Sequence, residues 1–244
     1  MIVIKLGGAV VAQPDSLADL AKAWQNRDGD ERWVVVHGAG PQLDAALKQH
    51  GEPVRVAGLR VTSPAAAWTV LRTLDGVGHC LAAALRGLGV PTIHVPASLG
   101  LFAAEPKAVE GVQRVGTARS FDAAALERCV PGGAIAVVTP VGWDEDGPLN
   151  INADEGASAA ARCLKAKRMV LATDVASVLD EAGEPIMAMT PETAHAFLAS
   201  KAAQGGIIPK VQAAVAGVDA GVAEVRIGRV SCASGDGGTR FSRG

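Results

Sequence analysis

Two short apolar runs, each followed by a glycine loop and a helical pattern, constrain the fold of this chain most. The first run, IVI at residues 2–4, is rich in β-branched residues and predicts a buried strand. Lys5 follows where a core residue is expected, and Gly7 and Gly8 then open the backbone before a helical pattern over residues 16–27. The exposed N–H groups could face an anion beside the lysine, or the loop could be a tight turn whose lysine reaches solvent. The residues alone leave both possibilities open.

The second run, WVVV at residues 33–36, leads into His37-Gly38-Ala39-Gly40, and Pro41 begins a helix to about residue 49. Proline suits a first helical position because the N–H that it lacks would have no partner there. In a parallel sheet, loops that lead from a strand into a helix lie at the same edge. We therefore expect an α/β fold in which the two glycine loops face one ligand.

The remaining periodicities predict alternating strands and helices. We expect strands at residues 92–95, 134–139, 169–172 and 223–228, helices at 64–88, 121–130, 154–166, 191–203 and 210–220, and hairpins or flaps at 52–63, 99–119 and 175–187. Residues 140–147 are predicted to be a polar, turn-rich insertion, and residues 235–244 a loose tail.

Composition narrows the class of protein. The 244 residues allow one large α/β domain or two small lobes, and a hydrophobic fraction of 49% can fill a sizeable core. The net charge of −2 provides no general attraction for nucleic acid or an anionic membrane. The four cysteines are spread without a CxxC pair, which is typical of reduced thiols in a cytoplasmic protein. No signal-peptide pattern is expected from the N-terminal residues.

Four further polar residues stand out by their position. Arg60 in the flap could grip a carboxylate or lie in solvent, and Asn150 could bind an amide or a carboxylate. Asp154, at the start of a helix, could cap it or hold two lysines in place. Lys210 follows Gly205 and Gly206 at a predicted helix N-terminus, where the helix dipole disfavours a cation, and this indicates a role with an anion.

Common catalytic signatures are missing from the sequence. It contains no Walker loop, complete GxGxxG, HRD or DFG motif, GxSxG elbow or His/Cys metal spacing. The residues that remain fit phosphoryl transfer to a carboxylate: glycine loops, lysines, an arginine, asparagines and an aspartate. Such an acceptor is already ionised and needs no general base, so catalysis depends on positioning and on compensating negative charge.

Several motifs together resemble those of a known family. KLGG at residues 5–8, HGAGP at 37–41, AGLRVTS at 57–63, NINAD at 150–154, TDV at 173–175 and GGIIPKV at 205–211 occur in the order found in the amino-acid kinase family. Within it, the chain resembles the acetylglutamate kinases over residues 1 to about 230. The resemblance implies a three-layer α/β/α sandwich around an open, mainly parallel eight-stranded sheet. It also implies an acceptor-binding lobe at residues 1–148 and an ATP-binding lobe at 149–244 of one domain.

The resemblance also implies roles for individual residues. Lys5 and Lys210 would stabilise the transferring phosphoryl group, and Asp154 would organise them. Acceptor contacts are implied at Ala39, Gly40, Arg60 and Asn150, with Arg60 on the α-carboxylate and Asn150 on the acetylamino group. Nucleotide contacts are implied at Gly8, Thr173, Asp174 and Gly206. The reaction would use N-acetyl-L-glutamate and ATP, whose Mg²⁺ is carried by the nucleotide, and no residue is assigned to a metal site.

The sequence departs from the family pattern at several points. Ala39 stands where the loop commonly has glycine, and its methyl group is expected to crowd the acceptor. Gly78-His79 replaces a usual Asn-Lys pair, and the N-terminal helix of arginine-inhibited hexamers has no counterpart. We expect an arginine-insensitive homodimer. The alternatives are a kinase for carrier-bound aminoadipate or glutamate, or for carbamate, and a non-catalytic amino-acid sensor of the same fold.

Overall fold

The computed structural model describes residues 1–51, 54–56 and 58–244. At its centre lies β1 (Ile2–Leu6), which pairs in parallel with β2 (Trp33–His37) on one side and β11 (Arg168–Ala172) on the other. All five residues of β1 are buried, because helices cover both faces of the sheet. Lys5 is the fourth of these five residues, so it lies near the carboxyl end of the central strand, at the edge of the core.

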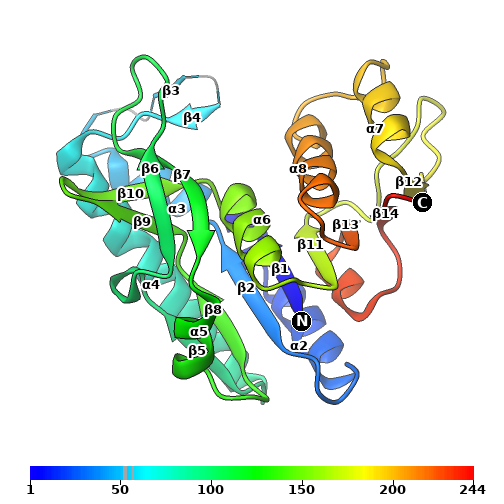
Figure 1. The fold of residues 1–244 in the computed structure, drawn as a ribbon, viewed down its shortest axis with the longest axis horizontal. Coiled ribbons are helices and arrows are strands. Elements are labelled where there is room, and N and C mark those ends of the chain that lie inside the picture. Colours follow the sequence, from blue (N-terminus) through cyan, green and yellow to red (C-terminus); the bar gives the residue numbers. More distant parts are fainter. Residues whose placement is uncertain (52–53, 57) are drawn as a thin grey trace.

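The main sheet extends in both directions from this centre (Figure 1). Over the described residues it has eight strands in the order β12-β14-β13-β11-β1-β2-β8-β5, and only the β13–β14 pair is antiparallel. The outer strands are β12 (Ala188–Met189), β14 (Thr239–Phe241), β13 (Glu224–Gly228), β8 (Ile135–Val138) and β5 (Thr92–Val95). The expected open, mainly parallel eight-stranded sheet is confirmed.

Two helical layers cover the sheet, as the alternation of its side chains requires. Val3 and its neighbours pack under α5 (Ala123–Cys129), α6 (Ala153–Cys163), α7 (Pro191–Leu198) and α8 (Ile207–Asp219). Ile2 and Ile4 face the opposite layer, which contains α2 (Pro14–Gln25), the end of α4 (Pro64–Gly87) and the 3₁₀ turn η2 (Val230–Ser234). The expected three-layer α/β/α sandwich is thus confirmed.

A second, smaller sheet lies beside the main one. It joins β6 (Phe102–Pro106), β7 (Val115–Phe121), β9 (Val141–Asp144) and β10 (Gly147–Ile151) in a closed arrangement. The predicted polar insertion at residues 140–147 is therefore wrong, because β9 and β10 form a hairpin there. Arg114 stabilises it with two hydrogen bonds to the Asp144 carboxylate, at 2.9 and 2.6 Å, and one to the Gly147 carbonyl oxygen.

The predicted loose tail is also wrong in part. β14 adds to the main sheet, where it pairs with both β12 and β13. The Thr239 hydroxyl, fully buried, donates to the Ile186 carbonyl oxygen at 2.6 Å and accepts from the Val178 amide. These long-range bonds order a segment whose local sequence is rich in glycine and polar residues.

Shorter elements complete the architecture. α1 (Gly8–Val11) and α3 (Gly40–Leu47) follow the two glycine loops, η1 (Ala97–Leu99) follows β5, and β3 (Arg55–Val56) pairs with β4 (Leu59–Arg60). The predicted flap at residues 52–63 is this hairpin, although positions 52, 53 and 57 lie outside the described residues. The predicted hairpin at 175–187 has a single antiparallel bridge, Leu179–Pro185. Over the described residues, none of the helices has the length and apolar character that a membrane crossing requires.

Candidate active site

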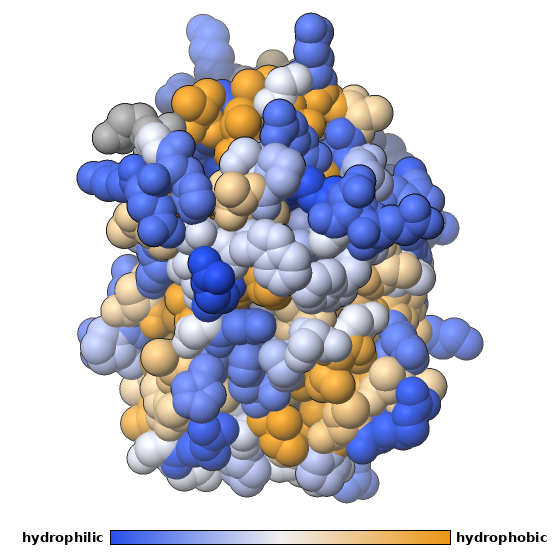
Figure 2. All heavy atoms as spheres, turned by 90° about the vertical axis from the view of Figure 1, so that its left-hand side faces the viewer, coloured by the Kyte–Doolittle hydropathy of each residue, from blue (hydrophilic) through white to orange (hydrophobic). Residues whose placement is uncertain are grey.

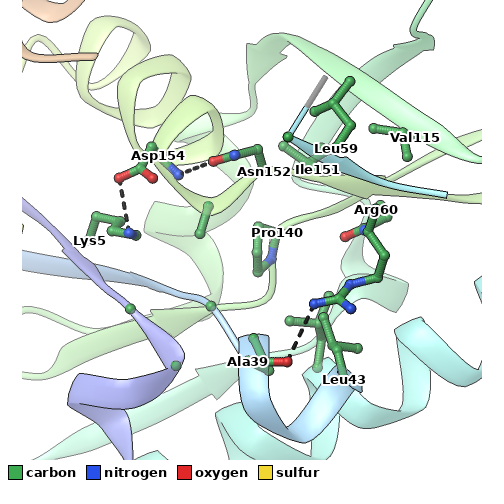
Figure 3. A pocket seen from close by; sticks show the side chains of 18 of the residues that line it. Lys5, Ala39, Leu43, Leu59, Arg60, Val115, Pro140, Ile151, Asn152 and Asp154 are labelled. Atoms are coloured by element: carbon green, nitrogen blue, oxygen red, sulfur yellow. Dashed lines mark hydrogen bonds and ion pairs between the residues drawn. The ribbon is translucent and has the colours of Figure 1, made fainter. Parts of the chain in front are cut away.

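Lys5 and Asp154 form an ion pair at the carboxyl edge of the main sheet. The Lys5 Nζ lies 3.0 Å from Asp154 Oδ1, and the two side chains are 11% and 24% exposed (Figure 3). Asp154 is the second residue of α6, where the positive end of the helix dipole favours a carboxylate. Asn152, not Asp154, is the N-cap, because its side-chain oxygen accepts from the Asp154 amide at 2.8 Å. The Asp154 carboxylate is thus available to hold Lys5.

The two glycine loops meet beside this ion pair. The Gly38 amide donates to the Leu6 carbonyl oxygen at 2.7 Å. A Cβ atom on Gly8 would lie 2.4 Å from the Gly40 amide nitrogen and 2.9 Å from Ala39 backbone atoms, so any side chain there would force the two loops apart. The expectation that both loops lie at one edge is confirmed.

A cavity of about 290 Å³ opens where these loops meet. It brings together most of the residues that the sequence marked for the acceptor and the phosphoryl group, namely Lys5, Ala39, Gly40, Arg60, Asn150 and Asp154. It also contains Gly8, which was predicted to contact the nucleotide. These residues come from β1, α1, the β2–α3 loop, the start of α3, β4, β10 and α6. Figure 3 shows Lys5, Asp154 and Arg60 around the opening. Ala39 is buried in an apolar cluster with Leu43 and Leu74.

Arg60 approaches this cavity from the β3–β4 hairpin. Its side chain is 5% exposed, its Nη1 contacts the Asp44 carboxylate, and its Nη2 lies 3.3 Å from the Gly40 carbonyl oxygen. The surface location that the sequence left open for Arg60 is therefore excluded. A buried guanidinium on the wall of a cavity can bind a carboxylate through parallel hydrogen bonds.

A second cavity, of about 310 Å³, lies on the β11 and α8 side. It brings together the other predicted residues, Thr173, Asp174, Gly206 and Lys210. The Thr173 hydroxyl donates to Asp174 Oδ1 at 2.9 Å, and the Lys210 ammonium donates to the Gly206 carbonyl oxygen at 3.2 Å. Lys210 does not begin α8 as predicted, because the helix starts three residues earlier, at Ile207.

Electrostatics connects the two cavities. Burial lowers the pKa of the Lys210 ammonium, and the positive charge of Lys5 lowers it further, while Asp154 and Asp174 oppose the shift. The hydrogen bond from Thr173 is the main cause of the lowered pKa of Asp174. Lys5 and Lys210 line different cavities. Among the described ion pairs, Asp154 contacts Lys5 and not Lys210, so it holds one of the two lysines that it was predicted to hold. The region between them therefore favours an anion.

A buried histidine cluster, which no sequence pattern indicated, lies next to the second glycine loop. His37, at the end of β2, is fully buried, and neither ring nitrogen has a hydrogen-bond partner among the described residues. Desolvation lowers its pKa to about 4, and His94 contributes to that shift. A Cβ atom on Gly78 would lie 2.6 Å from His94 Nε2 and 2.7 Å from His37 Nε2, which explains the glycine at this unusual position.

Within the described part of the chain, no group of three or more His, Cys, Asp or Glu side chains could hold a metal ion. The Asp154 carboxylate at the first cavity is engaged with Lys5, and the Asp174 carboxylate at the second accepts from Thr173.

Comparison with known proteins identifies the family. The model of the amino acid kinase family matches residues 1–229. The chain belongs to the amino acid kinase family. Among curated members of this family, acetylglutamate kinase from Methanopyrus kandleri is 35% identical over 240 residues, covering 93% of this chain and 94% of that protein. Acetylglutamate kinase from Rubrobacter xylanophilus is 37% identical over 224 residues, covering 91% of this chain and 86% of that protein.

A solved structure has a similar fold over the whole chain. The protein smu.665 from Streptococcus mutans superposes with a TM-score of 0.84 and 30% identity, covering 100% of this chain and 98% of that one. The family match extends beyond the short motifs to residues 1–229.

Proposed function

We propose that this chain is an acetylglutamate kinase, which transfers the γ-phosphoryl group of ATP to the side-chain carboxylate of N-acetyl-L-glutamate. The product is N-acetyl-L-glutamyl 5-phosphate, an intermediate of arginine biosynthesis. The observation that carries the proposal is the Lys5–Asp154 ion pair at the point where the two glycine loops meet. The names of the two curated relatives support this choice of acceptor.

The chemistry follows from charge. An oxygen of the acceptor carboxylate attacks the γ-phosphorus, the bond from that phosphorus to the bridging oxygen of ADP breaks, and ADP leaves with the electron pair. No proton moves, so no general base is required. The barrier is the approach of an anion to a polyanion, and preorganised cations lower it most. Lys5 and Lys210 act as these cations, Asp154 keeps Lys5 oriented, and backbone N–H groups at Gly8 and Gly40 add partial positive charge.

In this proposal, the acceptor and the nucleotide occupy different cavities. Arg60 binds the acceptor α-carboxylate, Asn150 contacts its acetylamino group, and Ala39 and Gly40 border it. Thr173, Asp174 and Gly206 bind the nucleotide. Residues 1–148 then mainly form an acceptor lobe and residues 149–244 an ATP lobe of one domain, with Asn150 and Asp154 reaching the acceptor side.

Mg²⁺ belongs to the proposal as an ion carried by the nucleotide phosphates. When bound, it would supply positive charge that offsets the negative charge of the nucleotide phosphates. The donor set is compatible with this arrangement, because the Asp154 carboxylate is paired with Lys5 and Asp174 accepts from Thr173.

The proposed activity is tested by ADP release with N-acetyl-L-glutamate, L-glutamate and carbamate as separate acceptors. We expect turnover with N-acetyl-L-glutamate well above that with the other two. Equal turnover with carbamate would contradict the acceptor assignment. Equal inactivity with all three, in protein that is folded and binds ATP, would favour a non-catalytic sensor.

Replacing Arg60 with alanine should raise the KM for N-acetyl-L-glutamate by about 10- to 100-fold, since a hydrogen bond to a charged group is worth about 1.5–3 kcal/mol. The KM for ATP should change little, because Arg60 lines the acceptor cavity and not the second one. Arg119, which is 60% exposed and pairs with Glu105, provides the matched control for loss of an arginine. Equal effects of Arg60→Ala on both KM values would remove Arg60 from the acceptor site.

We also infer a cytoplasmic homodimer. Among the described strands of the main sheet, β5 lies at one end, where an unpaired edge can add another strand. On the same side, Trp68 is 47% exposed and contacts Trp143 edge-on, with ring centroids 5.9 Å apart. Figure 2 shows apolar patches between charged side chains on the side that carries α4 and the β9–β10 hairpin. The cysteines of the described chain are free thiols, as is usual in a reducing cytoplasm.

Trp68→Glu should convert this dimer to monomer in sedimentation velocity, because a buried carboxylate without a partner is costly at an interface. Replacement of the exposed Leu179 with glutamate serves as the control for added charge on an exposed apolar residue elsewhere. An unmodified protein that sediments as a monomer or a hexamer would contradict the proposal.

A further inference from the structure

Asp44 contacts two arginines, Arg55 and Arg60, of which the proposed function uses only Arg60. It lies on α3, seven residues after His37, and its Oδ1 contacts Arg60 Nη1. Its Oδ2 lies 3.5 Å from Arg55 Nη2. Each carboxylate oxygen of Asp44 thus contacts a different guanidinium. Both arginines lower the pKa of Asp44, and Arg60 is the larger cause.

The β3–β4 hairpin needs such a counter-charge. Arg55 and Arg60 are direct partners across the antiparallel pair, and like charges in that position repel each other. Each strand has only two residues, and a hairpin without further support is marginally stable in water. Asp44 opposes the repulsion of both arginines and links the hairpin to the helix that follows the second glycine loop.

The position of Asp44 relative to the acceptor cavity determines what it can do. Arg55 and Arg60 line that cavity, whereas Asp44 is not among its lining residues. Asp44 holds the Nη1 of Arg60. The Gly40 carbonyl oxygen lies 3.3 Å from Nη2 and fixes the second nitrogen, a contact that Figure 3 draws as a dashed line. The guanidinium plane is therefore held at two points while the arginine still borders the cavity.

We propose that Asp44 is a positioning residue that aims Arg60 at a carboxylate of the acceptor, and that Arg55 is a second cation of the same subsite. This proposal rests on the proposed function and adds residues that determine its preference for acceptors with a second carboxylate.

The experiment measures binding of N-acetyl-L-glutamate by calorimetry in the absence of ATP, together with steady-state KM and kcat. Asp44→Asn removes the charge and keeps the size. It should weaken acceptor binding and raise the acceptor KM by about ten-fold, which is at the lower end of the range expected for loss of a hydrogen bond to a charged group. The kcat and the KM for ATP should change little. Asp219→Asn, on an exposed residue at the end of α8, should leave all of these values unchanged.

A double-mutant cycle separates positioning from a merely structural role. If Asp44 acts through Arg60, the double variant Asp44→Asn/Arg60→Ala should bind the acceptor no worse than Arg60→Ala alone. Arg55→Gln should weaken acceptor binding by itself. Additive effects in the cycle, tighter binding by Asp44→Asn, or unchanged binding by Asp44→Asn or Arg55→Gln would each overturn the proposal.

The two proposals fail in distinguishable ways. An unmodified protein that binds N-acetyl-L-glutamate but does not release ADP loses the kinase function, while the calorimetric cycle still tests Asp44. An unmodified protein that binds no acceptor overturns both. Normal turnover with an acceptor affinity that is insensitive to Asp44→Asn overturns the role of Asp44 alone.

Discussion

Lys5→Met should lower kcat by about 10²–10³, the usual effect of removing one preorganised group that stabilises charge in the transition state. Methionine keeps most of the length and the apolar stem of the lysine, so the packing of β1 is preserved. The ammonium that it removes is 3.0 Å from Asp154 and borders the acceptor cavity. The KM values should change much less than kcat, because charge compensation increases as the phosphoryl group moves.

The measurement is steady-state ADP release at saturating N-acetyl-L-glutamate and ATP. Lys22→Met, on the exposed face of α2, provides the matched control and should keep full activity. Thermal melting of each variant separates loss of chemistry from loss of folded protein. A kcat of Lys5→Met within three-fold of the unmodified enzyme, in folded protein, would exclude Lys5 from the catalytic step.

Acidification should destabilise the protein through His37. Its pKa falls from an ordinary value of 6.5 to about 4 in the folded state, chiefly because it is buried. Between these two pH values the unfolded chain binds a proton at this histidine that the native protein does not bind. The stabilisation is therefore complete above pH 6.5 and is lost as the pH falls towards 4. The free energy of unfolding should drop by about 3 kcal/mol over this window.

His94 adds to this acid sensitivity in the same direction. Desolvation lowers its pKa as well, while the nearby Asp75 carboxylate opposes the shift. His94 Nε2 lies 3.1 Å from the Thr139 hydroxyl and 3.8 Å from Asp75 Oδ1, so it has polar partners that His37 lacks. We therefore expect His37 to contribute the larger share.

The prediction is measured by urea unfolding from pH 4.5 to pH 7.5. His37→Asn should flatten the dependence of the unfolding free energy on pH, whatever its effect on the absolute stability at neutral pH. His195→Asn, on an exposed residue of α7, should leave the slope unchanged. A slope in His37→Asn equal to that of the unmodified protein would show that other groups are responsible.

Local sequence predicted the edge of the sheet where the site lies. This edge could be predicted from the apolar run before Lys5, the two glycine loops and the order of strands and helices. A buried parallel strand followed by glycine has few alternative structures. The family motifs then identified Arg60, Asn150, Asp154 and Lys210 as candidates. The structure brings the first three to the acceptor cavity with Lys5 and brings Lys210 to the neighbouring one.

Local sequence failed where distant contacts decide the structure. The β9–β10 hairpin was predicted as a polar loop, because its stability comes from Arg114, some 30 residues away from Asp144. The register of α8 was three residues off, since Gly206 itself has helical dihedral angles and stands as the N-cap. β14 forms because β12 and β13 offer it partners, and its own three residues do not predict a strand.

By itself, the sequence determined the class of fold, the strand-to-helix junctions that face the ligand and the residue types available for chemistry. These properties depend on neighbours in the chain, through the burial of apolar runs and the freedom of glycine. Only the tertiary structure decided which charges meet. The pairing of Lys5 with Asp154, the contacts of Asp44 with two arginines and the burial of His37 against Gly78 join segments far apart in sequence. Electrostatic energies depend on distance in space and on exclusion from water, and the order of residues along the chain specifies neither.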